Sequence, residues 1–108
     1  MMTNVRMQRM RNGLILTVDG HADRANDESF NECCAAVSTL CCAALNTFSR
    51  MHETGKGYGP HEVNEPGHME LRIYTLEKYM PELNGMADML QAGFEAIEAT
   101  YPGRIRVE

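Results

Sequence analysis

The chain has 108 residues, which is enough for one small domain with a modest core and too few for two. Apolar residues make up 44% of the chain and charged residues 23%, as in an ordinary globular protein. With 15 acidic and 10 basic residues the net charge is −5, which argues against a broad phosphate-binding surface and therefore against direct nucleic-acid binding.

The sequence shows none of the usual marks of a membrane or secreted protein. No apolar run approaches the ~20 residues that cross a bilayer, and the N-terminal residues lack the pattern of a secretory signal. The four cysteines form two adjacent pairs, Cys33-Cys34 and Cys41-Cys42, unlike the dispersed cysteines of a disulfide framework. We therefore expect a cytoplasmic protein with reduced thiols and no membrane contact.

The N-terminal residues predict a β-hairpin. Residues 4–10 alternate loosely, an Asn-Gly turn signal follows at positions 12 and 13, and residues 14–18 are rich in apolar and β-branched side chains. Gly20 and His21 follow where the second strand stops.

A polar, acidic stretch from Ala22 to Glu32 predicts a surface loop, after which the pattern becomes helical from about Asn31. Apolar side chains then recur every three or four residues, at Val37, Leu40, Cys41, Ala44, Leu45, Phe48 and Met51. Asn31 fits an N-cap, and Ser29 with Glu32 fits a capping box that would start the helix two residues earlier.

Glycines and Pro60 end this helix, and a polar loop is expected as far as Gly67. Alternating apolar residues from 69 to 75 predict a half-buried strand. A second amphipathic helix follows Pro81 and stops at residues 102 and 103, and residues 105–107 alternate as a last short strand.

The expected order is strand, strand, helix, strand, helix, strand within one domain spanning residues 1–108. Two amphipathic helices and four half-buried strands bury their apolar faces together when both helices cover one face of a sheet. The sequence therefore predicts an α+β two-layer sandwich with a mostly antiparallel four-stranded sheet.

A cysteine and a histidine occupy positions suited to nucleophilic catalysis. Cys34 falls in the first turn or two of the expected helix, where the helix dipole and unpaired amides favour the thiolate. His21, at a strand end, could accept the thiol proton and later protonate a leaving group. By residue type alone, such a cysteine is more often a small packing residue, and a histidine after glycine is more often a turn residue.

Two short motifs carry a more specific signal. Gly20-His21-Ala22, followed by Cys34-Ala35-Ala36-Val37-Ser38, resembles the paired signature of the ribosomal-processing cysteine protease family, Prp. The spacing near the C-terminus is similar to that of the family's last helix and strand, at Leu90, Gly93, Phe94, Ile97, Tyr101, Pro102, Ile105 and Val107.

The resemblance implies a two-layer α+β fold, a homodimer and a mobile loop between the two motifs. It implies a cysteine endopeptidase, without a cofactor, that removes a short N-terminal extension from a large-subunit ribosomal protein; some members cleave phage capsid or scaffold proteins. Cys34 would be the nucleophile and His21 its base, supported by Gly20, Asn31 and Ser38. Amides at the start of the first helix would form the oxyanion site.

The segment before the cysteines departs from the family pattern. Asn31 stands where the family has an aspartate, so no carboxylate is present there to orient an imidazole. The loop is also one residue longer, and spacing from His21 alone favours Cys33 as the nucleophile. The Ala-Ala-Val-Ser context favours Cys34 instead.

Two other functions fit the same residues. The cysteines and four histidines could bind a metal ion, although adjacent helical cysteines splay about 100° apart and do not chelate one ion well. The altered loop also fits a catalytically silent protein that binds an extended peptide or a partner without cutting it.

Overall fold

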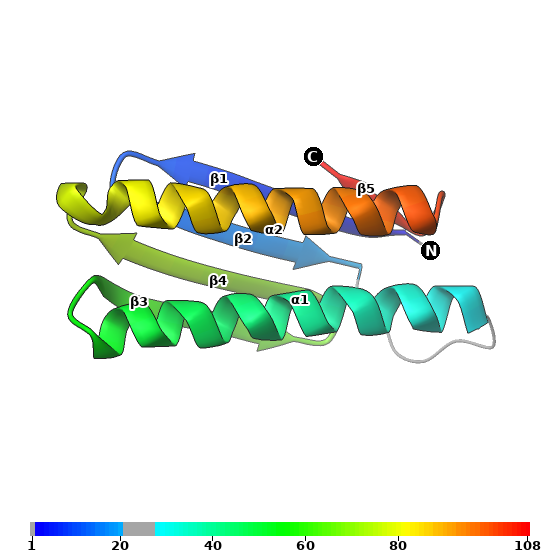
Figure 1. The fold of residues 1–108 in the computed structure, drawn as a ribbon. Helices are drawn as coiled ribbons and strands as arrows, with labels where there is room; N and C mark the ends of the chain where they lie inside the picture. The colour runs from blue at the N-terminus through cyan, green and yellow to red at the C-terminus, as the bar shows by residue number, and fades with distance from the viewer. Residues whose placement is uncertain (1, 21–27) are drawn as a thin grey trace.

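Two helices lie side by side on one face of a β-sheet in the computed structural model, which describes residues 2–20 and 28–108 (Figure 1). The strands are β1 (Thr3–Met10), β2 (Gly13–Asp19), β3 (Gly57–Glu65), β4 (His68–Thr75) and β5 (Ile105–Val107). The helices are α1 (Glu28–Glu53) and α2 (Met80–Thr100), the latter preceded by the short 3-10 helix η1 (Glu77–Tyr79). The predicted α+β class with both helices on one face is confirmed.

The sheet among these described residues has five strands in the order β3-β4-β2-β1-β5, so the predicted count of four is wrong. All neighbours pair antiparallel except β1 and β5, which are parallel. The additional strand is β3, which lies in the segment expected to be a polar loop. Residues 61–65 are all exposed and show no apolar alternation, and β3 pairs only with β4 at the sheet margin.

The core lies between the sheet and the helices. α1 packs against β3, and α2 packs over β1, β2 and β5. The largest fully buried side chains come from both layers: Val5, Leu14, Leu16, Val18, Val37, Phe48, Leu71, Ile73, Leu83 and Phe94. In β4 the buried residues Leu71, Ile73 and Thr75 alternate with half-buried ones, which is the period that the sequence shows for this strand.

The helices approach each other closely where α2 carries Gly93. A Cβ atom at this position would lie 2.8 Å from Cδ2 of Leu40 on α1. The absence of a side chain at Gly93 therefore lets Leu40 fill the space between the helices.

Helix α1 starts earlier than the sequence predicted. It includes Glu28, so Asn31 lies inside its first turns and is not the N-cap. The capping box of Ser29 with Glu32 also fails, because Ser29 is itself helical. The consequence for the site is that Cys34 sits deeper in the helix than expected.

The expectation that no segment could match a membrane span needs correction for this helix. By length and composition alone, Asn31–Glu53 is long and apolar enough to cross a bilayer, with a mean hydropathy of 1.2 over its most apolar window. Val37, Ala44 and Phe48 on this helix belong to the core beside the sheet, which gives its apolar composition a structural reason.

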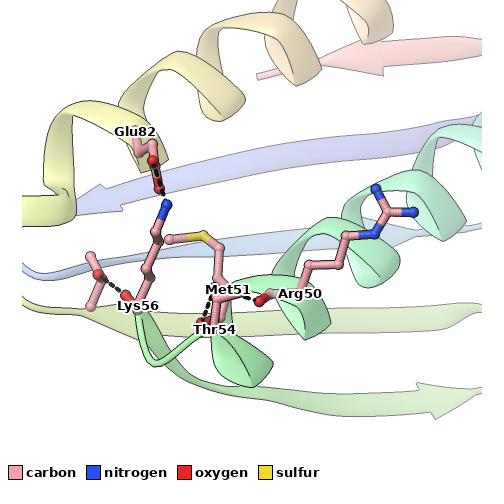
Figure 2. A network of polar contacts seen from close by, with 6 residues as sticks. Arg50, Met51, Thr54, Lys56 and Glu82 are labelled. Atoms are coloured by element: carbon pink, nitrogen blue, oxygen red, sulfur yellow. Dashed lines mark hydrogen bonds and ion pairs between the residues drawn. The ribbon is translucent and has the colours of Figure 1, made fainter.

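Polar contacts join the end of α1 to the start of α2 (Figure 2). The hydroxyl of Thr54 donates to the carbonyl oxygens of Arg50, at 2.8 Å, and Met51, at 3.3 Å. Lys56 Nζ lies 2.9 Å from Oε1 of Glu82 in the first turn of α2. The Thr54 bonds therefore close the last turn of α1, and the Lys56–Glu82 ion pair links the turn after α1 to the first turn of α2.

Candidate active site

The end of β2 and the start of α1 lie at the same end of the molecule (Figure 1). Gly20 closes β2 with a positive φ of 78°, and its amide donates to the carbonyl oxygen of Gly67 at 2.9 Å. A Cβ atom here would lie 2.5 Å from the backbone oxygen of Met2. Both the φ angle and this close approach require glycine, so the chain leaves the sheet in a fixed direction.

An ion pair that the sequence analysis missed lies directly before this glycine. Nδ1 of His68, at the start of β4, contacts Oδ1 of Asp19 at the end of β2. The hydrogen bond to Asp19 raises the pKa of His68 above its ordinary 6.5, and the charges of Asp19, Glu70 and Glu65 add to the effect. Only the β2–β4 register shows that His68 faces Asp19.

His21, the predicted base, lies outside the described residues, as do residues 22–27 of the expected loop. The residue before it, Gly20, is placed, and so are both candidate nucleophiles.

The two adjacent cysteines have different environments. Cys33 is 1% exposed and belongs to the core cluster with Val37. Cys34 is half-buried. Cys33 is therefore part of the core and Cys34 is not.

Burial raises the thiol pKa of both cysteines above the ordinary 9.0. For Cys33 the neighbouring Cys34 raises it further and the charge of Arg104 partly offsets this. Further along α1, burial together with Cys42 raises the pKa of Cys41 to about 12. A Cys34 thiol in this environment is protonated at neutral pH, so its activation requires a base.

The position of Cys34 in α1 changes the expected electrostatics. Only the first four amides of a helix lack an internal partner, and Cys34 lies in the second turn after Glu28. The free amides are therefore about 5 to 9 Å away along the axis. The helix dipole is correspondingly weaker at this sulfur than the sequence analysis assumed.

Ser38, one turn after Cys34 on the same helix face, lines a groove of about 220 Å³. We call this hollow the α1–β3 groove. Its other walls include Cys41 and Cys42 from α1, and Val18, Asn64 and Met69 from the sheet. Within residues 2–20 and 28–108, no three His, Cys, Asp or Glu side chains come together as metal ligands would.

The family model of cysteine protease Prp matches residues 2–106 of the chain. The chain belongs to the cysteine protease Prp family. The match covers nearly every residue and both motifs, so the cysteine protease activity suggested by the sequence is that of the family. No curated protein matches the chain by sequence.

Solved structures with the same fold include a member of this family. The essential ribosomal processing protease Prp from S. aureus, in complex with a substrate peptide, has a TM-score of 0.70 and 18% identity over 99% of this chain and 98% of that one. The same protease with a covalently linked product peptide gives a TM-score of 0.69 at 18% identity over the same shares. SMU.848 from Streptococcus mutans gives 0.73 at 18% identity over 99% and 92%.

Proposed function

We propose that this cysteine protease removes a short N-terminal extension from a protein of the large ribosomal subunit. The observation that carries the proposal is the family match over residues 2–106. The fold it shares with a ribosomal processing protease that was solved with a substrate peptide supports the same substrate class. A phage capsid or scaffold protein is the alternative substrate within the same chemistry.

The mechanism we propose uses Cys34 and His21. The imidazole of His21 takes the proton from the Cys34 thiol, and the sulfur attacks the scissile carbonyl. When the tetrahedral intermediate collapses, the C–N bond breaks and the imidazolium protonates the departing amine. A water molecule then attacks the thioester and releases the new carboxylate and the thiol.

Three observations support this assignment of roles. The half-buried Cys34 is open to a substrate, whereas Cys33 is 1% exposed in the core. The raised thiol pKa of Cys34 creates the need for a base. Gly20, the residue before His21, is anchored at the end of β2.

Supporting roles follow from position along α1. Ser38, on the same face one turn after Cys34, can orient the thiol or a substrate carbonyl. Asn31, now inside the helix, is three residues before Cys34 and so also on its side. We further propose a homodimer that works in the cytoplasm with reduced thiols.

The test uses a synthetic peptide that spans a ribosomal-protein N-terminal extension and its junction. Under reducing conditions we expect mass spectrometry to find two products from the unmodified chain. The Cys34→Ala variant should lose activity by on the order of 10³-fold or more, because the nucleophile is gone. The matched control, Cys33→Ala, should retain cleavage at a temperature where it is folded.

Two results would contradict the proposal. Binding of the peptide without cleavage would identify a catalytically silent peptide-binding protein. Loss of cleavage in Cys33→Ala, with retention in Cys34→Ala, would reverse the choice of nucleophile.

A further inference from the structure

We propose that Cys41 and Cys42 determine which substrates the protease accepts, because their small side chains keep the α1–β3 groove open for one bulky apolar side chain of the peptide. This inference rests on the proposed function, since it places a residue of that peptide in the groove.

The groove has the chemistry of a pocket for an apolar side chain. It has a volume of about 220 Å³ and opens to solvent, so a side chain can enter it from outside. Its apolar lining includes the buried Val18 and the half-buried Met69 and Cys41. Because burial keeps the Cys41 thiol protonated, with a pKa of about 12, this wall is uncharged at neutral pH.

Two exposed residues also line the groove, Asn64 on β3 and Cys42 on α1. A second hollow of about 90 Å³ continues along α1 toward Leu45, and Glu62 of β3 lines it. The two hollows share Cys41, Cys42, Asn64 and Met69, so they form one continuous groove.

The groove begins one helical turn from the proposed nucleophile. Ser38 lines it and follows Cys34 by four residues, about 6 Å along the helix axis. In an extended peptide, side chains on the same face are about 6.6 Å apart. A residue two positions from the scissile bond would therefore place its side chain in the groove while Cys34 attacks.

The free edge of β3 offers a backbone for the same peptide. β3 is the marginal strand of the described sheet, and regular pairing with β4 occupies only one of its edges from His61 to Glu65. An extended peptide can add to such an edge through main-chain hydrogen bonds, while alternate side chains enter pockets. The edge and the groove together favour binding of an extended segment of the substrate peptide.

Peptide binding is measured in a Cys34→Ala background, so that affinity is read without cleavage. The probes are fluorescein-labelled peptides that span the ribosomal-protein extension. Each carries Phe or Ala two positions from the scissile bond, either on its N-terminal or on its C-terminal side. Adding Cys42→Phe fills the groove and should weaken binding about tenfold or more for the Phe peptide whose Phe enters the groove. Binding of the corresponding Ala peptide should change less than twofold.

Thr39→Phe is the matched control, because Thr39 is exposed on the same helix but does not line the groove. It should leave every affinity within twofold. Equal affinities in the Cys42→Phe and parent chains, or no binding by the parent chain, would overturn the inference.

A labelling experiment covers the case in which Cys42→Phe does not fold. In the Cys34→Ala background, N-ethylmaleimide should modify the exposed Cys42 first, because Cys33 and Cys41 are shielded. A saturating Phe peptide should slow this reaction at least fivefold, since bound peptide covers the thiol. An unchanged rate would overturn the inference.

The outcome also separates this inference from the proposed function. Binding that depends on Cys42, without cleavage by the Cys34 chain, would retain the groove and reject the protease assignment. Cleavage that is unchanged by Cys42→Phe would retain the protease assignment and reject the role of the groove.

Discussion

Adjacent cysteines near the start of α1 differ in the property that matters for catalysis. Helical geometry turns Cys33 into the core, at 1% exposure, and leaves Cys34 half-buried. Apolar periodicity cannot separate two neighbours that flank one stripe, so the sequence alone could choose between them only through the Ala-Ala-Val-Ser context. The burial difference is a tertiary property, set by which side of α1 packs on the sheet and α2.

Removing His21 tests whether an imidazole activates the thiol. Burial raises the pKa of Cys34 above the ordinary 9.0, so without a base the thiolate fraction stays small until alkaline pH. In a His21→Ala variant we expect iodoacetamide to modify Cys34 with a midpoint above 9.0. The unmodified chain should react at lower pH, because the imidazole accepts the proton. Peptide mapping of the modified residue over a pH series measures both midpoints, and coinciding midpoints would contradict the proposed role of His21.

Secondary structure was predictable where one face of an element is buried. The hairpin, both helices and the strands β4 and β5 all show the apolar period of their class. β3 shows none, because its exposed residues from His61 to Glu65 are held by backbone pairing with β4. The start of α1 was misplaced for a related reason, since Asn31 is a good cap by residue type but lies inside the helix.

Two glycines of α2 give a matched test of helix packing. Gly85 is exposed and a Cβ there meets nothing within 4 Å, whereas a Cβ at Gly93 would press on Leu40. Gly85→Ala should stabilise the fold by about 0.5 to 1 kcal/mol through helix propensity. Gly93→Ala should gain less or destabilise, because Leu40 must move. Urea denaturation of both variants measures the difference in their free energies of unfolding. An equal gain in both would show that the contact between Gly93 and Leu40 does not limit the size of the side chain at position 93.

The pairing of β2 with β4 beside the site predicts a pH dependence. The hydrogen bond to Asp19 raises the pKa of His68 above 6.5, so the imidazolium form is favoured in the folded chain. Its stabilising effect is therefore complete below about 6.5 and is lost as pH rises through the folded pKa.

In Asp19→Asn the NMR titration midpoint of His68 should fall toward 6.5, and the stability difference from the unmodified chain should shrink at alkaline pH. The His68→Gln spectrum assigns the resonance. A midpoint that does not move would show that Asp19 is not the cause.

At the scale of the whole molecule, two layers bring distant parts of the sequence to one end. The β2–β4 pairing anchors Gly20 beside Gly67, and the side of α1 that follows Cys34 faces the α1–β3 groove. The sequence could predict that a strand end and a helix start carry the chemistry, since both motifs are local. The groove could not be predicted, because it depends on β3 and on the register that pairs Asn64 with Met69.

The most direct test of the central claim is covalent trapping by a substrate-like electrophile. A chloromethyl ketone built on the N-terminal half of a cleavable extension peptide is added to the unmodified chain, and intact-mass measurement and peptide mapping locate the thioether. We expect a single adduct on Cys34 that excess uncleavable peptide prevents, with Cys42 left unmodified although it is exposed. An adduct on Cys33, or one on the exposed Cys42, would contradict the account.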